Sequence, residues 1–108
     1  MQDYPDVAVV AVAGELDLSN ADDLVEQLDA AAAGRPLVVD LNRTLFIDSA
    51  ALHRLFLVAR GSGAGRLALV AEANAPVART LEIVQFQRAA IVATSVAEAH
   101  AALIRTSA

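Results

Sequence analysis

The chain has 108 residues, a hydrophobic fraction of 56% and a formal net charge of −5, values that predict a folded domain and exclude a disordered chain. It contains neither cysteine nor lysine, which excludes disulfides, thiolate zinc sites, thiol catalysis, a Walker A phosphate loop and Schiff-base chemistry. Its arginines are scattered over residues 35–105 without forming a basic patch, so we expect no nucleic-acid partner.

The first predicted elements are a strand and a helix. Residues 7–13 form an unbroken apolar run before a glycine, as expected of a strand that is buried on both faces. Ser19 is a suitable N-cap for the helix that follows, and residues 34–36 (Gly-Arg-Pro) end it. The apolar stripe of this helix consists of Ala21, Leu24, Val25, Leu28 and Ala31. Residues 1–4 could add a short edge strand.

A strand, a helix and another strand are predicted over residues 37–71. The apolar runs 37–40 and 67–71 have the composition of buried strands. A second helix lies between them and ends in the glycine-rich segment 61–65. Its buried stripe is expected to be Leu52, Leu55, Phe56 and Ala59.

The remaining part of the chain predicts a third helix, a fourth strand and a fourth helix. Pro76 suits the first turn of the third helix, with Asn74 near its cap, and the expected buried residues are Val77, Leu81 and Val84. Residues 89–93 form the fourth strand. Residues 95–98 (Ser-Val-Ala-Glu) match a capping box that opens the last helix, whose narrow apolar stripe is Val96, Ala99 and Leu103.

This alternation of strands and helices predicts an α/β fold. Four or five strands would form a mixed, mainly parallel sheet, with four helices mostly on one side of it. No linker or repeat divides residues 1–108, which we expect to form a single domain. Because no apolar run approaches the roughly 18 residues of a membrane span, and no signal peptide is visible, we expect a cytoplasmic protein without membrane insertion.

Residues 37–52 form the most specific segment of the chain. A buried strand leads through a short loop to Asp48 and Ser49, at the start of the second helix. The first-turn amide hydrogens of a helix have no intrahelical acceptor, and the helix dipole is positive there, so an anion is favoured. A phosphate on Ser49 would add roughly 1.5 to 2 negative charges beside Asp48. Taken alone, the pair favours an ordinary helix cap, because serine and aspartate are common N-caps.

Several motifs together resemble the STAS domain family. Residues 46–52 (Phe-Ile-Asp-Ser-Ala-Ala-Leu) are similar to the family's phosphorylation segment, and residues 14–17 (Gly-Glu-Leu-Asp) to its Gly-x-Leu-Asp turn. Residues 74–81 resemble the start of its third helix, and residues 96–99 the Glu-Ala step of its last helix. The resemblance extends over nearly the whole chain, in the same order, and implies a STAS-type fold.

The resemblance also implies a function, that of a bacterial anti-sigma factor antagonist. In such antagonists the serine after the aspartate is phosphorylated by an anti-sigma factor that is also a serine kinase of the histidine-kinase-like ATPase class. The unphosphorylated antagonist binds this kinase and frees the sigma factor for transcription. Ser49 occupies the position of that serine. The resemblance implies this kinase as the partner, with a serine phosphatase as a further partner, and implies no cofactor.

The chain departs from the family pattern at three places. Ala51 stands where glycine is usual, and Ala50 where a second serine or another small residue is common. Alanine is the better helix former by about 1 kcal/mol, so the fold tolerates the change, whereas close approach of a kinase to the backbone would tolerate it less. Residues 84–86 (Val-Gln-Phe) replace a glycine-containing turn.

Four further residues are candidates for the partner surface. Asp17 is either a turn and cap residue or, by the resemblance, a partner contact on the same side as Ser49. His53 and Arg60 lie on the same helix as Ser49 and either border the partner surface or form an ordinary exposed face. Leu57 falls off the core stripe, so it is either part of a binding patch or covered by a neighbouring loop.

We expect a binding module and not an enzyme, switched at Ser49. A carboxylate pair of Asp40 and Asp48 for a metal, as in a receiver domain, is disfavoured because that fold also requires a lysine. His53 and His100 lie in different predicted helices, so we expect no metal site. The alternative is a STAS scaffold without a phosphoswitch, as a subunit of an ABC-transporter or stressosome-like complex. Phosphorylation by the kinase would separate the two.

Overall fold

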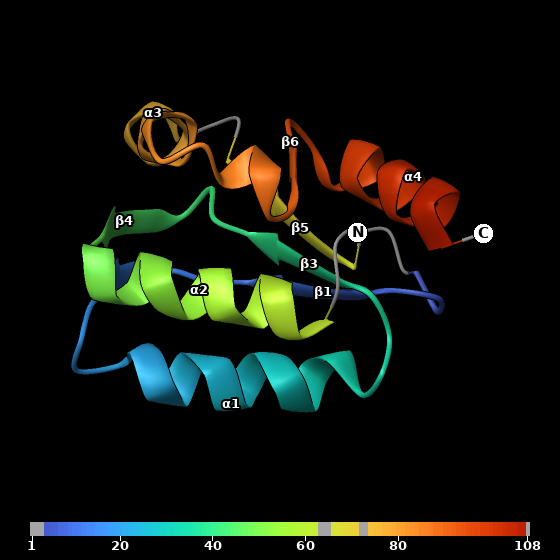
Figure 1. The fold of residues 1–108 in the computed structure, drawn as a ribbon, viewed down its shortest axis with the longest axis horizontal. Helices are drawn as coiled ribbons and strands as arrows, with labels where there is room; N and C mark the ends of the chain where they lie inside the picture. Colours follow the sequence, from blue (N-terminus) through green and yellow to red (C-terminus); the bar gives the residue numbers. More distant parts are fainter. Residues whose placement is uncertain (1–3, 63–65, 72–73, 108) are drawn as a thin grey trace.

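A computed structural model describes residues 4–62, 66–71 and 74–107, and within them the four strands of the main sheet alternate with four helices as predicted (Figure 1). Four strands form the main sheet in the order β1-β3-β5-β6, and every pairing in it is parallel. The bounds of these strands are Ala8–Ala11 (β1), Leu37–Asp40 (β3), Leu67–Val70 (β5) and Ile91–Ala93 (β6). The helices are Ala21–Ala32 (α1), Ser49–Ser62 (α2), Ala75–Ile83 (α3) and Val96–Ser107 (α4), with a 3₁₀ turn at Phe86–Arg88 (η1).

A second, two-stranded parallel sheet was not predicted. It pairs Gly14–Leu16 (β2) with Thr44–Ile47 (β4), a segment expected to be a loop. In β4 the two end residues, Thr44 and Ile47, are buried while the two between them are exposed, so the segment shows no alternating pattern. The Thr44 hydroxyl donates to the carbonyl of Val12 at 2.8 Å and is thereby satisfied. This small sheet leads directly into α2.

The helices divide between the two faces of the main sheet. α1, α2 and α3 contribute to one hydrophobic cluster that includes Val39 and Leu69, whereas α4 packs with Val38, Ala68 and Val70 on the opposite face. Figure 1 shows α1 and α2 side by side below the sheet and α4 above it. The alternation of burial in β3 and β5 follows from the period-2 geometry of strands. Three of the four described helices therefore share one core, as expected.

Burial separates the central strands from the edge strands. β3 and β5 are covered on both faces, as their unbroken apolar runs predicted. The same prediction was wrong for the first and fourth strands, because β1 and β6 lie at the edges of the main sheet, and Val9 is 42% exposed and Val92 37%. The suggested edge strand is not seen at Tyr4, and residues 1–3 lie outside the described part.

The helix caps agree in part with the sequence. Asn74 caps α3 by accepting from the amide of Val77, and Ser95 caps α4 by accepting from the amide of Glu98 at 3.0 Å. Ser19 is not the cap of α1, because Asn20 occupies that position, without a side-chain cap bond. α1 ends as predicted, with Gly34 in a left-handed conformation at φ +84°. α2 ends at Ser62, and residues 63–65 lie outside the described part.

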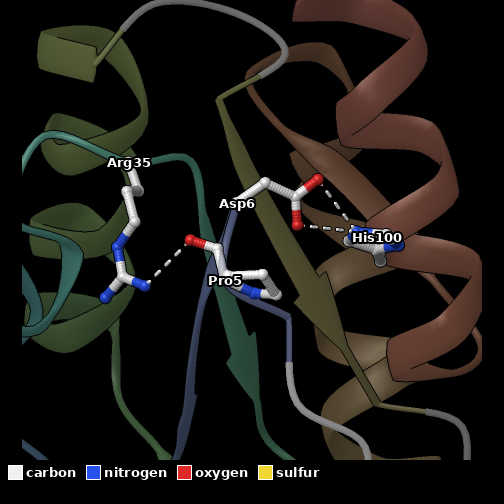
Figure 2. Close-up of polar contacts among 4 residues, drawn as sticks. All are labelled: Pro5, Asp6, Arg35 and His100. Carbon is white, nitrogen blue, oxygen red and sulfur yellow. Dashed lines mark hydrogen bonds and ion pairs between the residues drawn. The ribbon is translucent and has the colours of Figure 1, made fainter.

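The residues before β1 are held to α4 by an ion pair (Figure 2). Nε2 of His100 lies 3.0 and 3.2 Å from the carboxylate oxygens of Asp6, and its ring stacks on Tyr4 with centroids 4.0 Å apart. On the other side, the Arg35 guanidinium donates to the carbonyl of Pro5 at 3.4 Å. The hydrogen bond from His100 lowers the pKa of Asp6 below its ordinary value of 3.8.

This ion pair should make part of the stability dependent on pH. A carboxyl whose pKa is lowered by folding stabilises the fold above its ordinary value, 3.8 here, and this contribution disappears as pH falls through the lower folded value. His100→Ala should therefore reduce the free energy of unfolding at pH 6, and the difference from wild type should shrink at a pH below 3.8. Urea unfolding at both pH values measures it. An equal difference at both would contradict the role of Asp6.

Candidate functional site

Ser49 is the first residue of α2, as the sequence predicted, and its side chain is exposed. Among the described residues, no protein acceptor takes the amide hydrogens of Ser49 or Ala50. Two free donors at the positive end of a 14-residue helix favour an anion at this position. The hydroxyl is therefore both accessible and placed where an attached phosphate would be stabilised electrostatically.

Asp48 joins the start of α2 to the loop between β2 and α1. Its Oδ1 accepts from the amide of Ala51 at 2.9 Å, which makes it the N-cap of α2. Its Oδ2 accepts from the amide of Leu18 at 3.2 Å, and its own amide donates to the carbonyl of Leu16 at 3.0 Å. Both carboxylate oxygens are thus engaged. The side chain holds the loop beside Ser49.

Loss of the Asp48 carboxylate should therefore destabilise the fold measurably. Asp48→Ala removes an N-cap, at about 1 kcal/mol, and the bond to Leu18, at about another 1 kcal/mol. We expect the free energy of unfolding to fall by about 2 kcal/mol in a urea titration. Asp48→Asn is the matched control, since asparagine keeps one acceptor oxygen for the cap, whereas its NH2 group cannot accept from the Leu18 amide. The Asn variant should therefore lose only about half as much, and an Ala variant as stable as the Asn variant would show that the cap bond does not contribute.

The carboxylate of Asp17 closes the turn before α1. Its Oδ1 accepts from the hydroxyl of Ser19 at 2.5 Å and from the Ser19 amide at 2.9 Å, while its own amide donates to Oδ1 of Asn20 at 2.9 Å. The hydroxyl bond lowers the pKa of Asp17, so its carboxylate stays charged at neutral pH. Asp17 thus has the turn role, and it lies in the loop that Asp48 holds beside Ser49.

His53, Leu57 and Arg60 follow Ser49 along α2, and all three are exposed. Ser49 and His53 line one hollow of about 240 Å³, together with Leu52, Phe56, Val84 and Phe86. Leu57 is 44% exposed, so it is not covered by a loop, and it lines a different groove, between α1 and α2. The structure brings His53 to Ser49 and places Leu57 and Arg60 further along the helix.

Two residues in this hollow were expected in the core. Phe56 is 37% exposed, with its ring edge against Phe86 at a centroid distance of 5.9 Å, and Val84 is 48% exposed. Leu55 and Ala59 are completely buried, as predicted, and Leu52 packs partly buried against the core, which Ala51 also joins. Of the stripe assigned to α2 from the sequence, only Phe56 therefore lies outside the core. Since α3 ends at Ile83, Val84 falls in the turn after it.

Exposed apolar side chains surround the start of α2. Leu45 and Phe46, in β4, precede Asp48 and are 78% and 52% exposed, and Leu18, in the loop that Asp48 holds, is 74% exposed. None of the three was singled out from the sequence, although the apolar run 45–47 before Asp48 was a visible signal. Large side chains left uncovered next to a polar site are typical of a protein-binding surface.

Ala51, where the STAS pattern has glycine, is completely buried in the α1–α2–α3 cluster. Its methyl group packs in the core, and its amide donates to Oδ1 of Asp48. The alanine that replaces the usual glycine therefore lies beneath the surface around Ser49. Asp40 is likewise part of a turn, because its Oδ1 accepts from the amide of Asn42 at 3.0 Å.

Residues 4–62, 66–71 and 74–107 contain neither a metal-binding cluster nor a membrane-spanning helix. No three His, Asp or Glu side chains in these ranges come together as a metal-binding group would require. No helix in the same ranges is both long and apolar enough to span a bilayer.

Comparison with known proteins identifies a family and similar solved structures. The model of the STAS domain family matches residues 1–99. The crystal structure of an anti-sigma factor antagonist from Mycobacterium paratuberculosis is 26% identical, with a TM-score of 0.79 over 94% of this chain and 89% of that one. A candidate anti-sigma factor antagonist from Thermotoga maritima shares the fold at 20% identity, with a TM-score of 0.79 over 96% and 92%. No curated protein matches significantly.

Proposed function

Because the chain belongs to the STAS domain family, we propose that it is an anti-sigma factor antagonist that binds its partner through the start of α2. The observation that carries the proposal is Ser49, exposed on the first turn of α2 beside free backbone amides. The likeness to the antagonist from Mycobacterium paratuberculosis supports it. The proposed role is regulatory binding, with no catalysis by this chain, and it is carried out in the bacterial cytoplasm.

The proposed partner is an anti-sigma factor that is also a serine kinase of the histidine-kinase-like ATPase class. In the unphosphorylated state the antagonist would bind this kinase and release the sigma factor. The Ser49 hydroxyl oxygen would then take the γ-phosphoryl group of ATP and lose its proton, leaving ADP. A serine phosphatase would reverse the modification by hydrolysis. The cycle requires only that Ser49 reach the kinase, which its exposure allows.

The proposed contact surface combines charge with uncovered apolar area. Its polar part consists of Asp17, Asp48, Ser49, His53 and Arg60, and Leu57 extends it along α2. The exposed side chains of Leu18, Phe46 and Phe56 add apolar area around the same helix start. Burying such side chains contributes roughly 25 cal/mol per Å² removed from water, so these residues would supply affinity while the charged groups supply specificity.

Phosphate transfer in a purified system tests this function. The chain is incubated with the anti-sigma kinase and ATP, and intact mass followed by peptide mapping locates any phosphate. The expected result is one phosphoryl group, on Ser49, with loss of the stable complex. Ser19 and Ser95 provide an internal comparison, because both already make side-chain hydrogen bonds. Stable binding without any transfer would favour the scaffold alternative, a subunit of an ABC-transporter or stressosome-like complex.

A further inference from the structure

We propose that His53 is the intramolecular partner of a phosphate on Ser49, to which its imidazole donates a hydrogen bond. The inference rests on the phosphorylation proposed above and adds a positioning residue to it. Ser49 and His53 lie four positions apart on α2, at i and i+4, the spacing at which side chains of a helix are neighbours. Both side chains are exposed, and both line the same hollow.

Among the side chains that line this hollow, only that of His53 can pair with the phosphate, and the free amides of Ser49 and Ala50 are the backbone donors beside it. Leu52 and Phe56 come from α2, and Val84 and Phe86 from the turn after α3, and none of them carries charge. A phosphate on Ser49 would thus face apolar side chains on these sides. Opposite charges interact more strongly beside apolar surface than in open water, because the local dielectric constant is lower.

Three charged groups of α2 and of the loops beside its start already make contacts of their own. The guanidinium of Arg54 pairs with Asp22 at 2.9 Å. The carboxylate of Asp48 accepts from two backbone amides, and that of Asp17 accepts from Ser19. Arg60 lies eleven residues along α2 from Ser49, roughly 16 Å along the helix axis, which exceeds the screening length of about 8 Å at physiological salt.

The pairing should be visible in the titration of the phosphate. Phosphoserine loses its second proton near pH 6. An imidazolium next to the phosphate favours the dianion, so it lowers the midpoint of the phosphate titration. Asp48 is present in every variant below, and its repulsion cancels when variants are compared.

Phosphorus NMR on a chain that carries phosphoserine at position 49, installed during translation, tests the inference without any kinase. The midpoint of the phosphate titration is measured for wild type and His53→Gln in low salt. We expect the wild-type midpoint to lie about 0.15 to 0.4 pH unit lower, which is the energy of one opposite charge at this helical spacing converted to pH units. His53→Lys should keep the lowered midpoint, because lysine supplies a permanent charge. Arg60→Gln is the control and should match wild type.

Equal midpoints for wild type and His53→Gln would overturn the inference. A shift in Arg60→Gln as large as in His53→Gln would also overturn it, since the effect would then reflect the overall field of α2. Failure of the proposed function is seen separately, as absence of phosphate transfer from the kinase. The titration of the installed phosphoserine needs no kinase, so it tests the role of His53 whether or not the kinase phosphorylates Ser49.

Discussion

Ser49→Asp should weaken binding to the anti-sigma kinase at least tenfold, while Ser49→Ala should bind and accept no phosphate. The added carboxylate would stand beside Asp48 and would have to lose water on docking. An uncompensated charge in an interface costs several kcal/mol, whereas about 1.4 kcal/mol already corresponds to a tenfold change in affinity. Aspartate carries less charge than phosphate, so the phosphorylated protein should bind more weakly still. Calorimetric titration of wild type and both variants measures the effect.

Both Ser49 variants should fold as stably as wild type, which makes their comparison clean. The cap of α2 is the side chain of Asp48, so a change at exposed Ser49 should alter the free energy of unfolding by no more than about 0.5 kcal/mol. Thermal unfolding checks this before titration. Equal affinities of Ser49→Asp and Ser49→Ala for the kinase, together with no phosphate transfer to wild type, would contradict the phosphorylation switch and favour the scaffold alternative.

Leu55→Ala should produce the largest loss of stability among the substitutions considered. Leu55 is completely buried, on the face of α2 that packs with α1 and the main sheet. Truncating a buried leucine removes transfer free energy and leaves a cavity, at a cost of about 2 to 5 kcal/mol. A domain of this size is stabilised by only about 5 to 15 kcal/mol in total, so the variant should unfold at far lower urea concentration.

Leu57→Ala is the matched control for Leu55→Ala, because the two leucines lie two residues apart on the same helix. Leu57 is 44% exposed, so its truncation should change the free energy of unfolding by no more than about 0.5 kcal/mol. If Leu57 belongs to the proposed contact surface, the same variant should instead weaken binding to the kinase. Similar destabilisation by both substitutions would contradict the assignment of the buried and exposed faces of α2.

Local features of this protein were readable from the sequence because they depend on neighbours in the chain. The alternation of strands and helices followed from apolar runs separated by helical stripes, and the caps by Asn74 and Ser95 followed from short-range hydrogen bonding. The position of Ser49 at a helix start likewise followed from Asp48 and the stripe beyond it. These signals lie within a few residues of the feature they predict.

The surface around Ser49 was decided by the tertiary structure. β2 and β4 pair although about 30 residues of chain separate them, and Asp48 accepts from Leu18 across the same separation. No local sequence pattern therefore predicted either contact. Whether an apolar residue is buried depends on which strand or helix covers it. Val9, Phe56 and Val84 are exposed because no strand or helix covers them fully. The sequence by itself determined the helices, the four strands of the main sheet and the place of Ser49 at a helix start, but not β2 and β4. The packing of those elements decided which apolar side chains remain outside the core, because burial is a property of all the neighbours together.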